Sequence, residues 1–147
     1  MKNTERGFTL LEVLTVAVVI GVLTAIAVPS WQTHVLRTRR SEATAALLDL
    51  QRAQDRYFGI HARYAPAAQL DSAPPGGLGL HELTPLGAYR LELNTAADGL
   101  GFLASATAVP SSGQAGDERC ARFTIDHLGQ RRATDASGIE RSADCWR

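Results

Sequence analysis

The first part of the chain is dominated by an uninterrupted apolar run that begins at Phe8 and ends at Val28. Glu12 is the only charged residue among these 21 positions. A helix of this length is about 31 Å long, which matches the roughly 30 Å hydrocarbon core of a bilayer. A secretory signal peptide has a shorter apolar region followed by a small-residue cleavage site, and no such site is clear here. The pattern predicts one membrane-spanning helix near the N-terminus.

Apolar positions continue beyond this run with helical spacing and predict an amphipathic helix. They recur mostly every three, four or seven residues, at Trp31, Val35, Leu36, Ala43, Leu47, Leu50, Tyr57 and Phe58. Charged residues, including Arg39, Arg40 and Asp55, fill other positions. We expect the apolar stripe to pack on a sheet. Gly59 is a residue type suited to a helix C-terminus, so the helix should end near it.

Two residues mark the segment of the long helix that should bend most readily. Pro29 has no backbone N–H, so we expect it to interrupt the helix and kink it. Gly21, eight residues earlier, is also a weak helix former. Bending or unwinding is therefore predicted between Gly21 and Pro29.

The second half of the chain predicts strands. Apolar and polar residues alternate in residues 88–94 and 121–127, residues 100–109 form a further candidate, and residues 130–134 could add a short fourth strand. Asp98-Gly99 suits a hairpin turn. The Pro- and Gly-rich residues 73–79 should form a loop. We predict an α+β fold: a long N-terminal helix, transmembrane and then amphipathic, packed on a small antiparallel sheet of three or four strands.

Charges before the apolar run predict the membrane orientation. Lys2 and Arg6 precede it, so the N-terminus should remain in the cytoplasm and the larger part of the chain should lie outside. Glu5 weakens this basic leader without reversing it. Cys120 and Cys145 then face an oxidising periplasm and should form a disulfide closing 26 residues, worth roughly 3–4 kcal/mol. Two cysteines without a CxxC pair or clustered histidines make a poor metal site.

The overall charge argues against a strongly electrostatic partner. The chain has 15 basic and 15 acidic residues, which leaves only local patches open to such a role. One candidate patch comprises Arg119, Arg122, Arg131, Arg132, Arg141 and Arg147. Acidic residues lie among these arginines, at Asp117, Glu118, Asp126, Asp135, Glu140 and Asp144. The mixture favours an ordinary solvated surface over DNA binding, which stays an alternative.

The chain has no recognisable catalytic or metal-binding motif. The four histidines, His34, His61, His81 and His127, are dispersed, and neither HExxH nor Gly-x-Ser-x-Gly occurs. We therefore predict no enzymatic activity, no cofactor and no metal.

Glu12 has two explanations. It could lie near the headgroups and stay hydrated. Alternatively, cleavage between Gly7 and Phe8 would create an α-amine that Glu12 of a neighbouring subunit could pair with. At about 4 Å and an effective dielectric near 20, that attraction is about 4 kcal/mol before desolvation is subtracted. Such a pair would fix a staggered arrangement of identical helices.

The stretch from Arg6 to Glu12 resembles the N-terminus of type IV prepilins. Gly7 matches the residue before the prepilin-peptidase cut, Phe8 the first mature residue, Glu12 the assembly glutamate and Pro29 the helix-kinking proline. The resemblance implies cleavage after Gly7, N-methylation of Phe8, storage in the membrane and extrusion into a filament. It divides the chain into a leader (1–7), a transmembrane and filament-core helix (8–29) and a periplasmic globular domain (30–147).

Later segments are similar to PilE-like minor pilins. They are residues 54–58, 64–65, 120–131 and 144–147, whereas residues 61–87 match poorly. This resemblance implies a low-abundance subunit that primes or joins the filament in pilus assembly, twitching motility or adhesion. Implied partners are other pilin subunits, prepilin peptidase, the inner-membrane assembly machinery and membrane lipid before assembly. A type II secretion pseudopilin and a DNA-binding pilin for natural transformation stay alternatives.

Overall fold

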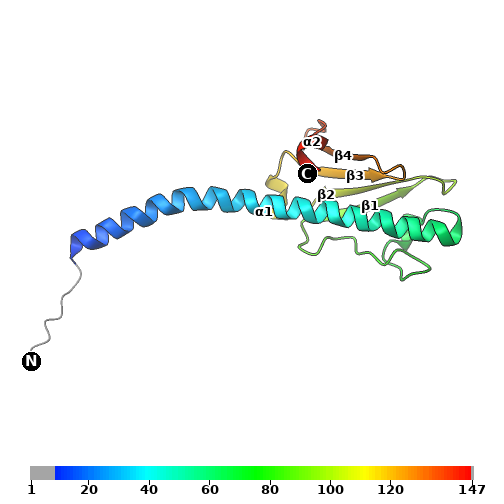
Figure 1. The fold of residues 1–147 in the computed structure, drawn as a ribbon, viewed down its shortest axis with the longest axis horizontal. Helices are drawn as coiled ribbons and strands as arrows, with labels where there is room; N and C mark the ends of the chain where they lie inside the picture. The colour runs from blue at the N-terminus through cyan, green and yellow to red at the C-terminus, as the bar shows by residue number, and fades with distance from the viewer. Residues whose placement is uncertain (1–8, 147) are drawn as a thin grey trace, which may run out of the picture. The chain divides into compact units, whose positions relative to one another are not determined.

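The computed structural model describes residues 9–146, and the chain divides into two compact units between Val35 and Leu36. Helix α1 (Leu10–His61) runs through both units (Figure 1). Its second part lies beside four strands that follow later in the chain. The N-terminal unit is the first part of α1, and the C-terminal unit is the globular part of the protein.

The first part of α1 exposes its apolar side chains around the whole helix, with exposed fractions that include 86% for Leu10 and 50% for Val16. By its length and composition, α1 is apolar enough to cross a membrane. The hydroxyls of Thr15, Thr24 and Thr33 each donate to the carbonyl four residues earlier, at 2.8, 2.9 and 3.1 Å. At Thr15 and Thr24, which lie within the apolar run, these bonds satisfy hydroxyl groups that would otherwise be costly in hydrocarbon.

Helix α1 remains helical through both Gly21 and Pro29. Neither residue ends or unwinds the helix in this structure, so the predicted interruption is not seen, and a kink at Pro29 stays a prediction. The predicted end at Gly59 falls two residues short of His61. The residue that follows, Ala62, has φ of 52°, and its N–H donates to the Phe58 carbonyl at 2.8 Å. Ala62 thus takes the left-handed conformation in which helices commonly end on glycine.

The sheet is an antiparallel meander in the order β1-β2-β3-β4. Its strands are β1 (Tyr89–Thr95), β2 (Phe102–Ala108), β3 (Arg122–Asp126) and β4 (Arg131–Thr134). All four match segments expected from the sequence, and the α+β fold class is confirmed. The hairpin between β1 and β2 also forms as expected: Gly99 has φ of 72°, and the Asp98 carboxylate accepts the Leu100 N–H at 2.9 Å.

The core lies between one face of α1 and the inner face of the sheet. Along α1 the buried residues are Ala43, Leu47, Leu50, Ala53, Gln54 and Tyr57. From the strands come Tyr89, Leu91, Leu93, Phe102, Ala104, Ala106, Phe123, Ile125 and Ala133. The alternation of buried and exposed residues along β1 is what places Tyr89, Leu91 and Leu93 on one face. Small Ala104 and Ala106 on central β2 leave room for the larger side chains around them.

Three short elements complete the fold: η1 (Ala67–Gln69), η2 (Gly113–Gly116) and α2 (Ser142–Cys145). In η2 the Ser112 hydroxyl accepts the Gln114 N–H at 3.2 Å and caps the turn. Helix α2 lies next to β4, because the Ala133 N–H donates to the Ser142 hydroxyl at 2.9 Å.

Candidate functional site

The predicted processing residues Gly7 and Phe8 lie outside the described residues. Glu12 is exposed in the first turn of α1. Its N–H donates to the Thr9 hydroxyl at 3.3 Å. Thr9 and Glu12 have the spacing of a capping box, in which an acid at the third helical position also favours the positive helix end. This local role for Glu12 was missed in the sequence, although the Thr-x-x-Glu spacing carries the signal.

The expected disulfide is present: Cys120 and Cys145 are bonded, and both are buried. Cys120 lies just before β3, and Cys145 ends α2. The bond therefore joins the C-terminal segment to the residues that lead into β3.

The C-terminal segment is also held by contacts that the sequence did not predict. The Trp146 indole N–H donates to the Arg132 carbonyl at 2.8 Å, and its ring packs edge-on against Phe123 at 5.9 Å. The Arg131 guanidinium lies 5.6 Å from the Trp146 ring centre. The C-terminal segment is therefore held by Trp146, which packs on the core, as well as by the disulfide.

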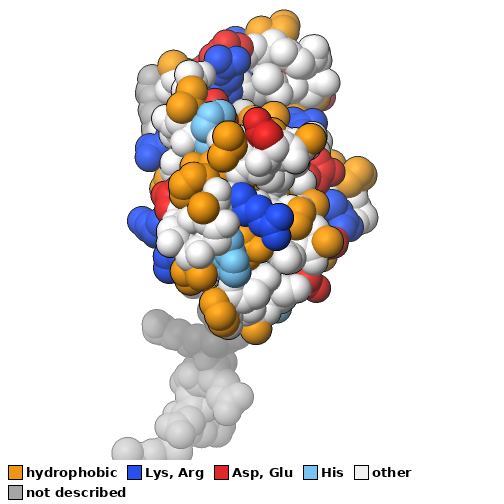
Figure 2. Space-filling view, turned by 90° about the vertical axis from the view of Figure 1, so that its right-hand side faces the viewer, with side chains coloured by type: hydrophobic (Ala, Val, Ile, Leu, Met, Phe, Trp, Pro, Cys, Tyr) orange, Lys and Arg blue, Asp and Glu red, His pale blue; other side chains and the backbone are white. Residues whose placement is uncertain are grey.

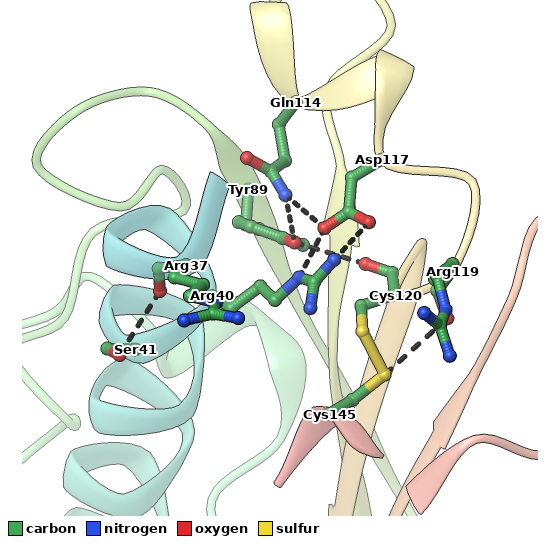
Figure 3. Close-up of polar contacts among 9 residues, drawn as sticks. All are labelled: Arg37, Arg40, Ser41, Tyr89, Gln114, Asp117, Arg119, Cys120 and Cys145. Carbon is green, nitrogen blue, oxygen red and sulfur yellow. Dashed lines mark hydrogen bonds and ion pairs between the residues drawn. A yellow bond between two sulfur atoms is a disulfide. The ribbon is translucent and has the colours of Figure 1, made fainter. Parts of the chain in front are cut away.

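A polar network joins α1 to residues 117–120, which we call the disulfide segment because it ends at Cys120 (Figure 3). Arg40 donates through Nε and Nη2 to the two carboxylate oxygens of Asp117, at 2.5 and 2.6 Å. The Gln114 side-chain amide donates to Asp117 at 2.7 Å and to the Tyr89 hydroxyl at 2.9 Å. The Tyr89 hydroxyl donates in turn to the Cys120 carbonyl at 3.1 Å. Four segments of the chain thus meet at one hydrogen-bonded cluster.

The network shifts the ionisation of two members. The hydrogen bond to Asp117 raises the pKa of the Arg40 guanidinium above its ordinary value. Burial, reinforced by the negative charge of Asp117, raises the pKa of the Tyr89 hydroxyl. Tyr89 therefore stays protonated and can donate to the Cys120 carbonyl.

Sequence reasoning placed Arg40 among the polar positions of α1, and the structure corrects this. Arg40 is half-buried and stands three residues before buried Ala43, on the apolar stripe. Gln54 is likewise buried on the stripe and bonds both backbone groups of Ala65, at 2.8 and 3.0 Å. The helical spacing of Arg40 and Gln54 along the apolar stripe could have indicated that they face the core. Their hydrogen-bond partners, however, are brought to them only by the fold.

A hollow of about 510 Å³ lies between α1 and the disulfide segment. Its lining includes Arg37, Arg40 and Ser41 on the helix, and Arg119 and Asp144 beside the disulfide. Arg119 and Asp144 form an exposed ion pair at 3.3 Å. We refer to this feature as the arginine hollow. Its three guanidinium groups make it suited to an anion.

The other arginines of the C-terminal third do not form a continuous positively charged surface. Arg122 pairs with Glu92 of β1 at 3.5 Å, and Arg141 pairs with Asp135 at 3.3 Å. The end of the globular unit seen in Figure 2 likewise shows basic, acidic and hydrophobic side chains interspersed. This arrangement agrees with the mixed surface expected from the sequence.

The histidines lie in separate places. His61 stacks on Tyr57 at 4.1 Å, and His127 lies beside Phe102 at 6.5 Å. Within residues 9–146, no group of three or more His, Cys, Asp or Glu side chains is placed to hold a metal ion.

Comparison with known families decides the assignment. The profile of a family described as "Type IV minor pilin ComP, DNA uptake sequence receptor" matches residues 29–124. The chain belongs to this type IV pilin family. A second profile, the prokaryotic N-terminal methylation motif, matches residues 2–28. The two matches meet at Pro29, and together they confirm the resemblance inferred from the N-terminal motif and the later minor-pilin segments.

Individual relatives are also pilins. The type IV major pilin protein PilA of Myxococcus xanthus is 39% identical over 50% of this chain and 34% of its own. The type IV major fimbrial protein FimA of Dichelobacter nodosus is 31% identical over 54% of this chain and 62% of its own. The chain thus spans less than two thirds of the length of the relatives it matches. A solved type IV pilin from Shewanella oneidensis is similar with a TM-score of 0.45 and 21% identity, over 65% of this chain and 89% of that one.

Proposed function

We propose that this type IV pilin is a minor structural subunit of the pilus. Prepilin peptidase removes residues 1–7, and Phe8 is N-methylated. The subunit is stored in the inner membrane with its N-terminus in the cytoplasm and its globular domain in the periplasm. The inner-membrane assembly machinery then transfers it into a filament with other pilin subunits, where it primes assembly or occupies a few positions.

The observation that carries this proposal is the apolar surface of the first part of α1. Side chains between Leu10 and Val28 are exposed on every side of the helix. A helix that is apolar all round requires a non-aqueous environment. The bilayer supplies it before assembly, and packed helices of neighbouring subunits supply it in a filament.

Glu12 is the one charged group among the described residues of this apolar segment. Such a group in hydrocarbon costs roughly 2.5–3.5 kcal/mol on insertion scales unless it is hydrated or paired. A neighbouring subunit's Phe8 amine would compensate the charge and set the stagger between helices. The capping contact with Thr9 uses the backbone of Glu12, so its carboxylate remains available for this pairing.

Quantitative mass spectrometry of sheared surface filaments tests the proposal. We expect a trace amount of this chain, beginning at methylated Phe8, beside an abundant different pilin. Dominant abundance would make this chain the major subunit, in line with the names of its relatives. Processed protein confined to the membrane would instead support a pseudopilin or a priming-only role.

A DNA-binding role in natural transformation is the second candidate, because the matching family is described as a DNA uptake sequence receptor. Arg131 and Arg132 are the C-terminal arginines that suit phosphate contacts best, since neither pairs with a carboxylate within residues 9–146. A mobility-shift assay with the detergent-solubilised chain and duplex DNA tests this role. Binding should weaken with salt and with Arg131→Gln/Arg132→Gln, but not with Arg52→Gln. Absence of any salt-dependent shift at low ionic strength would remove this candidate.

A further inference from the structure

We propose that the arginine hollow binds a sugar phosphate or a similar hydroxyl-bearing phosphate monoester. Of the residues that line it, Arg37, Arg40 and Arg119 hold the phosphate, and Asp144 accepts a hydrogen bond from a hydroxyl group of the ligand. Every residue of the lining lies between Arg37 and Cys145, within the C-terminal unit, so the site is complete in one unit of one chain. A ligand of this kind goes beyond the structural role proposed above.

Arg40 provides a fixed donor in the hollow. Its Nε and Nη2 both bind Asp117, which orients the planar guanidinium. An arginine has five N–H donors, so those on Nη1 remain available to a ligand. In Figure 3 this nitrogen points away from Asp117. A donor that is already ordered loses little entropy when an anion binds.

Arg37 and Arg119 complete the cationic lining from two directions. Arg37 lies three residues before Arg40 on α1, is exposed, and pairs with no carboxylate within residues 9–146. Arg119 comes from the disulfide segment and contacts Asp144 through Nη2 at 3.3 Å, with 70% and 45% of the two side chains accessible. Exposed pairs of this kind contribute little, so Arg119 can direct its remaining N–H donors to a ligand.

Three separate guanidinium groups favour a phosphate monoester over a carboxylate or a phosphodiester. A planar carboxylate is matched by a single arginine, as Asp117 is matched by Arg40. A phosphate monoester has three terminal oxygens and a charge of about −1.5 to −2 at pH 7, whereas a phosphodiester has two such oxygens and a single charge. The lining carries three arginines and one carboxylate, that of Asp144. Asp117 lies outside the lining and offsets part of the Arg40 charge, which leaves the hollow net positive.

Asp144 and the size of the hollow indicate that the phosphate is attached to a hydroxyl-bearing group. The Oδ2 of Asp144 accepts from Arg119, whereas its Oδ1 accepts no side-chain hydrogen bond within residues 9–146. A bare phosphate dianion has no O–H group to donate to this oxygen, but the hydroxyl of a sugar has one. The volume of about 510 Å³ exceeds that of one phosphate group and lies within the roughly 300–1,000 Å³ typical of small-molecule sites. A sugar phosphate therefore satisfies both the arginines and Asp144.

Isothermal titration calorimetry of the full-length chain in a non-ionic polyoxyethylene detergent tests the proposal. We expect mannose 6-phosphate to bind more tightly than inorganic phosphate, mannuronate or the methyl phosphodiester of mannose 6-phosphate. Arg37→Gln/Arg119→Gln should weaken its binding by about tenfold or more, as expected when hydrogen bonds to a charged group are lost. Asp144→Ala should remove the preference for mannose 6-phosphate over inorganic phosphate. Pentamannose with a terminal 6-phosphate is titrated in parallel, and the tighter of the two sugar phosphates identifies a free molecule or a saccharide chain as the source.

Either sugar phosphate supports the proposal if its binding depends on the hollow. The titration uses the unassembled chain, so its failure would leave the proposed role in the filament unaffected.

Matched controls separate this site from general surface charge. Arg52→Gln/Arg56→Gln removes two exposed arginines of α1 outside the hollow and should leave binding unchanged. Circular dichroism and the intact disulfide mass report whether each variant is folded. Equal binding of mannose 6-phosphate by folded hollow variants and wild type would overturn the proposal. Binding of inorganic phosphate or of the phosphodiester as tightly as the monoester would also overturn it, by revealing a general anion site.

Discussion

Arg40 and Asp117 are 77 residues apart in the chain and form a two-bonded ion pair that joins α1 to the segment before the disulfide. Only 2% of the Asp117 side chain is exposed, against 22% for Arg40. The carboxylate also accepts a hydrogen bond from buried Gln114. The pair therefore closes the end of the core at which the C-terminal segment is attached.

Asp117→Ala should destabilise the protein by about 3 kcal/mol, because it leaves Arg40 without its buried partner. This is the low end of the usual range, since Arg40 retains some solvent contact. Thermal denaturation followed by tryptophan fluorescence measures the loss. Arg40→Met/Asp117→Leu should recover most of it, as apolar pairs can replace buried ion pairs. A loss no larger than that of Asp49→Ala, which breaks the exposed pair with Arg52, would contradict a structural role for the pair.

Replacing Ala62 by glycine should stabilise the protein by about 1 kcal/mol, because a left-handed conformation is costly for residues with a Cβ. The φ of 52° at Ala62 is the only positive value of a non-glycine residue within residues 9–146. A rise in melting temperature of about 3 °C would be the corresponding change. Ala62→Val is the matched opposite and should lower the melting temperature. Equal melting temperatures for the three proteins would contradict the strain.

The turn after β4 should loosen in acid. Hydrogen bonds from the backbone N–H groups of Ile139 and Ser137, with help from Arg141, lower the pKa of Asp135 below its ordinary 3.8. A depressed folded-state pKa contributes stability that is complete above 3.8 and is lost as pH falls through the folded value. Carboxyl NMR titration of Asp135 and amide exchange at Ile139 measure this effect. Asp135→Asn should remove the acid-induced change, and an Asp135 pKa above 3.8 would contradict it.

Cys145→Ser should destabilise the fold by about 3–4 kcal/mol in the chain-entropy view of a disulfide. Trp146 should still hold part of the segment through Arg132 and Phe123. We therefore expect faster trypsin cleavage after exposed Arg141, with a further increase in Cys145→Ser/Trp146→Ala. Trypsin resistance equal to wild type in the single variant would mean that the disulfide is dispensable. Equal cleavage of the single and double variants would mean that Trp146 contributes no anchoring.

Glu12→Gln tests whether the charge of Glu12 is needed, because it keeps the backbone contact with Thr9. Glutamine can serve in a capping box, but it carries no charge for a neighbouring subunit's Phe8 amine. If charge pairing directs assembly, Glu12→Gln should be cleaved normally but should be depleted from filaments. A pairing free energy of about 1.4 kcal/mol corresponds to a depletion of about tenfold. Thr9→Val is the matched control, since it removes the capping hydroxyl and keeps the charge. Normal incorporation of Glu12→Gln would contradict the pairing.

Much of the fold could be predicted because its signals are local. The apolar run determines a membrane-length helix, and the alternation in residues 88–94 and 121–127 determines strands and their buried faces. The Asp98-Gly99 turn selects the hairpin, and two cysteines without rival partners predict their own bond. The N-terminal motif identified the family because cleavage and membrane insertion depend on contiguous sequence.

Only the tertiary structure decided which polar residues belong to the core. Arg40, Asp117 and Gln114 read as surface residues because their partners lie far away in the chain, and burial depends on those partners. Trp146 likewise anchors the C-terminal segment only because β3 and β4 bring Phe123 and Arg132 beside it. The arginine hollow has the same origin. The sequence by itself determined the local elements and the family, whereas long-range packing determined where charges are paired and where a hollow is left between them.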